Sequence, residues 1–583
     1  MVSNTIEIKD KFYVNGKPVQ IISGAIHYFR IVPEYWRDRL EKLKAMGCNT
    51  VETYVPWNLH EPQKGTYCFE GILDIKKFLE IAAELELWVI FRPSPYICAE
   101  WEFGGLPAWL LAEDGMRFRS SYPSFIQHTA DYYKKLFEIT APLQLPLGGP
   151  IILIQVENEY GYYADDTSYL EQMKQLMVDN GACVPFVTSD GPWGDALECG
   201  KLEGVLPTGN FGSKMKAQFD VLKEHTNGGP LMCMEFWVGW FDHWGNGGHK
   251  TSNMEENCKD LDEALQYGNI NIYMFIGGTN FGFMNGSNYY DELTPDVTSY
   301  DYDAVLTECG DITPKYEAFK EIIGKYVQLP VVEFTTKIEK KAYGKLICKE
   351  KVGLFESLEV ISTPVTDLFP KSMEKLGQSY GYTLYRSSLV KEKKLDKIRL
   401  YNANDRAKIY ISQEPVATLY DRELLYEHAI SYEYEKGSTI DILMENMGRV
   451  NFGPYLDKQR KGIDGSVVIN GHQHMNWEHY TLPLDNLHKL DFTKGFREQK
   501  PAFYRFELLV EEKGDTFIDM EGWGKGCVFI NGFNLGRFWE IGPQKRLYLP
   551  APLLKEGINE IIVFETEGKA SEQLVLCDKP DLG

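Results

Sequence analysis

Acidic residues stand at the ends of two short apolar runs that lie far apart in the chain. Ile151–Ile154 leads into Gln155-Val156-Glu157-Asn158-Glu159, and Leu231–Met234 leads directly into Glu235. An ionised carboxylate that leaves water costs free energy unless it is paired, so such residues need a structural or chemical reason. A single one is better explained by a salt bridge or by solvation. Several of them, with Trp and Tyr nearby, favour catalysis.

Two carboxyl groups on either side of a glycosidic bond can hydrolyse it without a metal ion or a cofactor. One protonates the departing oxygen, and the other attacks the anomeric carbon or activates water; in the retaining version they lie about 5 to 5.5 Å apart. Glu235 is one candidate, and the other is Glu157 or Glu159. The pattern does not choose between those two, because residues two apart point to the same side of a strand.

Eight apolar runs in the first 330 residues alternate with amphipathic stretches such as Tyr35–Met46 and Ile72–Leu87. This alternation predicts a (β/α)₈ barrel, an α/β fold whose active groups stand at the carboxyl ends of the strands. A doubly wound sheet is the competing fold, but no glycine-rich phosphate loop follows the first strand. The predicted strands are Val19–Ile26, Thr50–Val55, Trp88–Arg92, Ile151–Val156, Pro185–Ser189, Gly204–Pro207, Leu231–Met234 and Ile270–Phe275.

The pattern changes after about Leu329. Residues 372–583 hold alternating runs separated by Gly, Asn and Asp turns, and Thr383–Arg386 weakly resembles Phe503–Phe506. We therefore expect a barrel over 1–330, a connector over 331–371, and two β-sandwich domains over 372–490 and 491–583. The predicted strands include Tyr382–Val390, Ile398–Tyr401, Ala407–Ser412, Thr439–Met444 and Cys527–Ile530.

Charge and composition exclude several classes of partner. The 583 residues include 61 Lys and Arg against 84 Asp and Glu, a net charge of −23, which disfavours nucleic acid and anionic membranes. No run reaches the roughly 18 to 20 apolar residues of a membrane span, and the start lacks the apolar core of a signal peptide. The 11 cysteines form no CxxC pair and the 11 histidines show no paired ligand spacing. We predict a cytoplasmic protein with no metal and no cofactor.

Six segments resemble the signature blocks of glycoside hydrolase family 35, the retaining β-galactosidases, in the family's order over most of residues 15–325. They read TYVPWNLHEP, RPSPYICAEWEFGGLPAWLL, QVENEYG, MEFWVGWFDHWG, YMFIGGTNFG and TSYDYD. The resemblance implies that Asn158-Glu159 carries the acid/base, that Glu235 is the nucleophile, and that Glu157 has a supporting role.

The same resemblance implies a set of galactose-binding residues with suitable chemistry. Glu100 can accept hydrogen bonds from two sugar hydroxyls, Asn158 can bond the 2-hydroxyl, and tyrosines supply both hydroxyls and apolar walls. Each tyrosine could instead be an ordinary core aromatic. The residues are Tyr54, Ile97, Cys98, Ala99, Glu100, Asn158, Tyr273, Tyr300 and Tyr302.

Aromatic residues beyond Glu235 and in the β region are candidates for stacking on the leaving sugar. They are Trp237, Trp240, Trp244 and, at the turn Asn451–Tyr455, Tyr455. Packing between domains is the alternative explanation. The β domains resemble the jelly-roll, galactose-binding-like sandwiches of the family, for which we expect a structural role and which could also form a homodimer.

Taken together, these features predict an exo-acting retaining β-galactosidase whose partner is a carbohydrate. The resemblance suggests a preference for β-1,3 linkages to N-acetylhexosamine. The alternatives are another exo-β-glycosidase, such as a β-glucosaminidase, a carbohydrate-binding scaffold without turnover, and a metal-dependent hydrolase on the same barrel.

Overall fold

A closed barrel of eight parallel strands forms the first half of the molecule in this computed structural model, which describes residues 4–390 and 393–583. The strands are β4 (Ile22–Ile26), β5 (Thr50–Tyr54), β6 (Trp88–Arg92), β7 (Ile151–Gln155), β8 (Phe186–Asp190), β9 (Leu206–Asn210), β10 (Met232–Trp237) and β11 (Asn269–Ile276). Each of the eight predicted strands overlaps a barrel strand, so the predicted barrel is confirmed, although the strand predicted over Gly204–Pro207 shares only two residues with β9. Both faces of the strands are buried, and strands such as β7 and β11 are accordingly rich in apolar residues.

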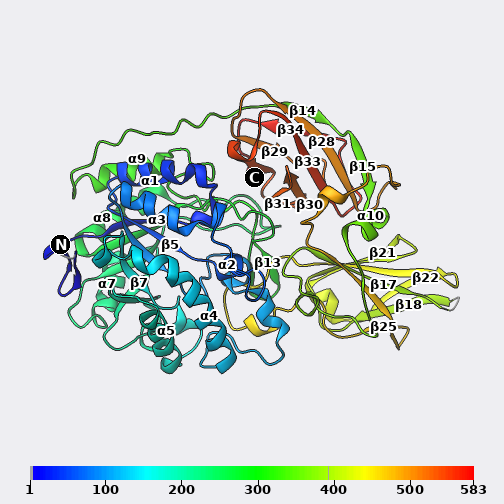
Figure 1. The fold of residues 1–583 in the computed structure, drawn as a ribbon, viewed down its shortest axis with the longest axis horizontal. Coiled ribbons are helices and arrows are strands. Elements are labelled where there is room, and N and C mark those ends of the chain that lie inside the picture. Colours follow the sequence, from blue (N-terminus) through cyan, green and yellow to red (C-terminus); the bar gives the residue numbers. More distant parts are fainter. Residues whose placement is uncertain (1–3, 391–392) are drawn as a thin grey trace.

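Helices cover the barrel (Figure 1). In α3 the buried residues Ile75, Phe78, Leu79 and Ala82 follow the helical period. This helix begins later than predicted because the carboxylate of Asp74 accepts a hydrogen bond from the backbone N–H of Lys77 at 2.9 Å and caps it. The helices are α1 (Trp36–Ala45), α2 (Trp57–His60), α3 (Ile75–Glu84), α4 (Pro123–Thr140), α5 (Thr167–Asp179), α6 (Ala196–Cys199), α7 (Met215–Lys223), α8 (Met254–Tyr267) and α9 (Pro314–Ile323).

The first β domain contains a six-stranded sheet, β16-β27-β17-β23-β20-β21, and a four-stranded sheet, β22-β18-β25-β26. An apolar core that includes Leu395, Ile409 and Ile442 fills this domain. The strands are β16 (Val365–Asp367), β17 (Tyr382–Ser388), β18 (Lys393–Leu400), β20 (Arg406–Ile411), β21 (Glu414–Tyr420), β22 (His428–Tyr434), β23 (Thr439–Glu445), β25 (Val467–Ile469), β26 (His472–His474) and β27 (Trp477–Leu482).

The second β domain contains a five-stranded sheet, β15-β28-β33-β30-β31, and a four-stranded sheet, β14-β34-β29-β32. The prediction that all-β domains follow the barrel is therefore confirmed. The strands are β14 (Gly344–Ile347), β15 (Glu350–Gly353), β28 (Ala502–Val510), β29 (Thr516–Asp519), β30 (Lys525–Ile530), β31 (Phe533–Trp539), β32 (Arg546–Leu549), β33 (Gly557–Glu565) and β34 (Gln573–Cys577).

The range expected to be a connector, 331–371, contributes strands to both β domains. An extended segment leads from α9 to β14 (Figure 1). There β14 pairs with β34 and β15 with β28, both antiparallel, before α10 (Leu354–Ile361) and β16 lead into the first β domain. The second β domain is thus built from both ends of the β region. The domain limits drawn from the sequence at 330, 371 and 490 stay a prediction.

Short elements complete the chain. A three-stranded antiparallel sheet of β1 (Ile6–Ile8), β2 (Phe12–Val14) and β3 (Lys17–Val19) precedes the barrel. Two small pairs are β12 (Ser287–Tyr289) with β13 (Leu293–Pro295), and β19 (Ala403–Asn404) with β24 (Gly462–Ile463). Among the described residues, no helix combines the length and the apolar character that crossing a bilayer would require.

Candidate active site

A pocket of about 270 Å³ opens where the barrel strands end. It brings together the residues that the sequence analysis assigned to catalysis or sugar binding, except Tyr300, Trp244 and Tyr455. Its lining comprises Tyr54, Ile97, Cys98, Ala99, Glu100, Asn158, Glu159, Tyr162, Glu235, Trp237, Trp240, Phe241, Tyr273, Asn288, Tyr290, Tyr302 and Phe452.

Glu235 lies in β10 and is held by three donors. The hydroxyl of Tyr54 donates to its Oε1 at 2.7 Å, the indole N–H of Trp237 donates to its Oε2 at 3.0 Å, and the Arg92 guanidinium lies 2.8 Å from its Oε1. These contacts fix the orientation of the carboxylate, and Arg92 compensates its charge in a buried site.

Glu159 has a different environment in the same pocket. The side-chain amide of Asn210 donates a hydrogen bond to the carboxyl group of Glu159 at 3.2 Å. Burial, together with the nearby charge of Glu235, raises the pKa of Glu159 to about 7. A carboxyl group with such a pKa holds a proton near neutral pH and can donate it.

Asn158 directly precedes Glu159 and contacts Tyr54 and Arg92, the same two side chains that contact Glu235. Its side-chain oxygen accepts from Arg92 at 2.8 Å and lies 2.9 Å from the hydroxyl of Tyr54, whose single proton is donated to Glu235. Because the oxygen is occupied, the amide N–H₂ is the group that Asn158 can offer to a ligand.

Glu157 does not line the pocket. Its two oxygens accept from the guanidinium of Arg119 at 3.1 and 2.8 Å, and the Tyr169 hydroxyl donates to it at 2.8 Å. The alternation rule that left Glu157 and Glu159 equivalent fails here for a backbone reason. Strand β7 ends at Gln155, and both glutamates have left-handed backbones, with φ of 59° and 47°.

The loop after β6 supplies three consecutive lining residues with left-handed backbones. Cys98, Ala99 and Glu100 have φ of 57°, 56° and 50°. The carbonyl of Ala99 accepts from Arg30 at 2.5 Å, and the backbone N–H of Gly286 donates to the carbonyl of Glu100 at 2.9 Å. Backbone strain of this kind is found where a site needs its groups in fixed places. We call residues 96–105 the pocket loop.

Tyr300 acts on the pocket through Glu100. Its hydroxyl donates to the Glu100 carboxylate, while the Arg30 guanidinium lies 3.9 Å from the centre of its ring. Burial raises the pKa of Glu100 to about 7, against the lowering effects of Tyr300 and Arg30. Tyr273 and Tyr302 do line the pocket, with their rings edge to face at 5.7 Å.

The predicted stacking residues separate into two groups. Trp237 and Trp240 line the pocket, edge to face at 5.7 Å, and Trp240 is 40% exposed. Trp244 is buried and Tyr455 packs edge-on against Tyr289 at 5.6 Å, and neither is part of the lining. From the turn that holds Tyr455, the residue in the lining is Phe452.

Several functional side chains were missed by the sequence analysis. Asn210 ends β9, but that strand was expected to stop at Pro207. Arg92 ends β6 and carried the same signal as Glu235, a charged residue closing an apolar strand. Buried Glu52 lies 3.5 Å from Arg92, and burial raises its pKa to about 7. Among the described residues, no group of three or more His, Cys, Asp or Glu side chains could hold a metal ion.

Comparisons with known proteins agree along nearly the whole chain. The model of glycosyl hydrolases family 35 matches residues 11–326, and models of the first all-beta domain and the galactose-binding domain of beta-galactosidase match 370–483 and 501–559. Beta-galactosidase-1-like protein 2 from Homo sapiens is 41% identical, over 98% of this chain and 91% of that protein. A beta-galactosidase from Xanthomonas manihotis is 40% identical, over 92% of this chain and 90% of that protein. This chain therefore belongs to glycosyl hydrolase family 35.

Proposed function

We propose that this protein is an exo-acting retaining β-galactosidase in which Glu235 is the nucleophile and Glu159 the acid/base. The observation that carries the proposal is the unlike environment of two carboxyl groups in one pocket. Glu235 is paired with a guanidinium, whereas the pKa of Glu159 is raised to about 7 by burial and by the charge of Glu235. Pairs of carboxyl groups with different protonation are typical of glycosidases.

The reaction proceeds by two displacements. Glu235 attacks the anomeric carbon while Glu159 gives its proton to the departing oxygen, and the glycosidic bond breaks. Glu159, now ionised, takes a proton from water, whose oxygen attacks the same carbon and releases Glu235 from the galactosyl ester. Both side chains return to their starting states.

The pocket supports recognition of a single terminal sugar. Glu100, Asn158 and Tyr273 surround the carboxyl pair, and the volume of about 270 Å³ suits one monosaccharide with part of its leaving group. Removal of one galactose at a time from a chain end follows from such a pocket. A preference for β-1,3-linked N-acetylhexosamine is the finer part of the proposal.

Replacing Glu235 by Gln tests the catalytic assignment. We expect kcat on nitrophenyl β-galactoside to fall by more than about 10⁴-fold, because the amide is a poor nucleophile. Galactose should still raise the melting temperature, since the pocket keeps its shape. Near wild-type hydrolysis by this variant would reject the mechanism.

Product analysis tests the substrate. Lacto-N-biose, N-acetyllactosamine and lactose differ in linkage and leaving sugar, and a panel of nitrophenyl glycosides includes the glucosaminide that the alternative requires. We expect galactose release, fastest from lacto-N-biose, with the β-anomer formed first by NMR. A first-formed α-anomer would exclude double displacement.

A cytoplasmic location and a homodimer formed through the β region are further parts of the proposal. Cell fractionation tests the first, and light scattering of the purified protein tests the second.

A further inference from the structure

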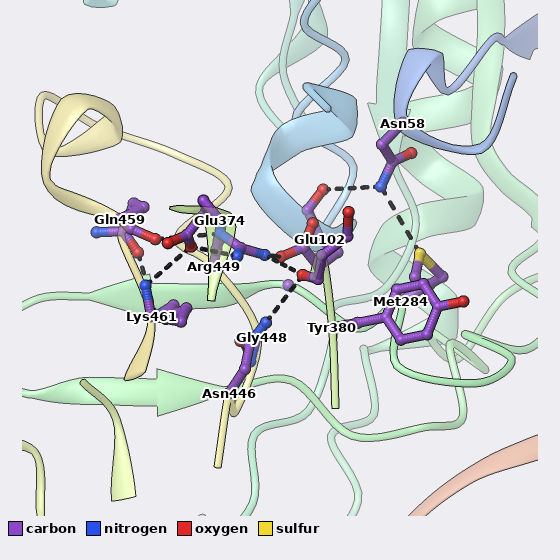
Figure 2. Close-up of polar contacts among 12 residues, drawn as sticks. Asn58, Glu102, Met284, Glu374, Tyr380, Asn446, Gly448, Arg449, Gln459 and Lys461 are labelled. Carbon is purple, nitrogen blue, oxygen red and sulfur yellow. Dashed lines mark hydrogen bonds and ion pairs between the residues drawn. The ribbon is translucent and has the colours of Figure 1, made fainter. Parts of the chain in front are cut away.

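A buried arginine of the first β domain lies against the barrel, close to the pocket loop (Figure 2). Arg449 is fully buried and contacts two carboxylates. Its guanidinium donates to Glu102 of the barrel at 2.5 Å and to Glu374 of its own domain at 2.5 Å. The backbone carbonyls of Ser379 and Gln459 accept from it at 2.7 and 3.1 Å.

These contacts lead to the pocket within a few residues. Glu102 belongs to the pocket loop and follows Glu100 by two positions. The backbone N–H of Phe103 donates to the carbonyl of Arg449 at 3.4 Å, and the Tyr96 hydroxyl donates to the carbonyl of Asn451 at 2.5 Å.

The two segments lie in close contact. A Cβ placed on Gly104 would lie 3.1 Å from the carbonyl oxygen of Asn451, and it would clash with the ring of Tyr96 in its own loop at 2.4 Å. The side-chain amide of Asn451 lies 3.6 Å from the sulfur of Cys98, and the next residue, Phe452, reaches the pocket lining. Residues 449–452 therefore follow the outer side of the pocket loop.

The pocket loop needs such support because its backbone is strained. A non-glycine residue in a left-handed conformation is unfavourable and persists only where the surroundings hold it. On the barrel side, Arg30 and Gly286 bond the carbonyl groups of Ala99 and Glu100. On the side of the first β domain, Arg449 bonds Glu102.

Buried ion pairs of this kind give little net stability, because desolvation offsets the attraction between the charges. What they supply is a fixed geometry, since a misplaced guanidinium would leave buried carboxylates unpaired. We infer that Arg449 is a positioning residue for sugar binding: by fixing Glu102 it holds Cys98, Ala99 and Glu100 in the conformation that receives the galactose. This inference rests on the proposed function.

The alternative is that Arg449 only joins two domains, and the chain offers a matched control for it. Arg406 is also a buried arginine of the first β domain, and it donates two hydrogen bonds of 3.0 Å to Glu567 of the second β domain. Neither Arg406 nor Glu567 lines the pocket. Arg406→Lys therefore disturbs a comparable contact between domains without touching the site.

The experiment compares Arg449→Lys, Glu102→Gln and Arg406→Lys in the full chain. Lysine keeps the charge of arginine but cannot reach two carboxylates with a planar fork. We expect KM for nitrophenyl β-galactoside and the inhibition constant of galactose to rise together by about tenfold in the first two variants, because the sugar contacts are displaced. Arg406→Lys should lower the melting temperature comparably and change both constants less than about twofold.

Each outcome distinguishes a role of Arg449 in positioning the pocket loop from a role only in joining the two domains. Unchanged KM and galactose inhibition in an active Arg449→Lys or Glu102→Gln overturns the inference, and so does an equal rise in Arg406→Lys. If Arg449→Lys does not fold, Glu102→Gln decides alone, because it removes the charge from the barrel side at constant size. A wild-type protein that releases no galactose from any β-galactoside rejects the proposed function instead.

Discussion

The inner end of the pocket and its rim are built in different ways. At the inner end, Tyr54, Asn158 and Glu235 are buried and connected by polar contacts of 2.7 to 2.9 Å. At the rim, Trp240 and Phe452 are 40% and 41% exposed. Groups fixed by several partners discriminate strongly, because a wrong ligand leaves buried polar atoms unpaired, whereas exposed aromatic faces accept many partners. The inner end should therefore define the sugar and the chemistry, and the rim should adjust the choice of leaving group.

After the loss expected for Glu235→Gln, the next largest effect should come from Glu159→Gln at the inner end. We expect kcat/KM on lactose to fall by about 10³-fold, because an amide cannot protonate the departing oxygen. Dinitrophenolate leaves without that proton, so the first step on a dinitrophenyl galactoside should be nearly unaffected. Measuring kcat/KM on both substrates gives the comparison, and equal losses of kcat/KM on the two would contradict the role of Glu159 as the acid.

The variant Glu157→Gln tests the difference in role between Glu157 and Glu159, which are two positions apart in the sequence. The substitution leaves the buried Arg119 without its carboxylate, so we expect the free energy of unfolding to fall by about 3 to 5 kcal/mol. Activity of the folded enzyme should fall much less than in Glu159→Gln, because Glu157 does not line the pocket. Urea unfolding and kinetics at a temperature where the variant is folded measure the two effects. A loss of activity equal to that of Glu159→Gln would place Glu157 in the chemistry.

The pH dependence of kcat/KM tests the protonation proposed for the inner end. Glu159 must be protonated to act as the acid, and its pKa is raised to about 7. Activity should therefore be present below this pKa and decline as the pH rises through about 7. Glu100 and Glu52 also have pKa values raised to about 7, so the decline alone does not identify the residue.

The variant Asn210→Ala tests whether Glu159 is the group whose ionisation causes the decline in activity. The hydrogen bond from Asn210 lowers the pKa of Glu159, so its removal should move the decline in activity to higher pH. A pH profile of the variant that coincides with that of the wild type would assign the decline to another group.

The sequence predicted the inner end better than the rim, for physical reasons. In β10 the apolar run Met232–Met234 leads directly into Glu235, so this residue and the strand that carries it could be found locally. Asn210 was missed because a glycine and a proline near the end of β9 suggested an earlier turn. Neither periodicity nor spacing could show that Glu157 turns away from Glu159, since left-handed backbones decide it.

Local sequence patterns could not predict the contacts between domains. Arg449 and Glu102 are 347 positions apart, and nothing in the sequence around either one indicates the other. Phe452 illustrates the same limit on a smaller scale. The aromatic turn of the β region was recognised, but which of its rings reaches the pocket depends on how the first β domain is seated against the barrel.

The smallest effect should come from the rim, where Trp240→Ala tests stacking on the leaving sugar. Loss of an aromatic face costs about 0.5 to 1.5 kcal/mol beyond buried area, so kcat/KM on a disaccharide should fall about 2- to 10-fold. A nitrophenyl galactoside has no leaving sugar, and its rate should change less. Tyr455→Ala is the matched control, because its ring is equally exposed but lies outside the lining, and it should change neither rate. Equal losses on both substrates in Trp240→Ala would mean that the ring maintains the shape of the pocket. Trp240 would then not belong to the part of the rim that selects the leaving group.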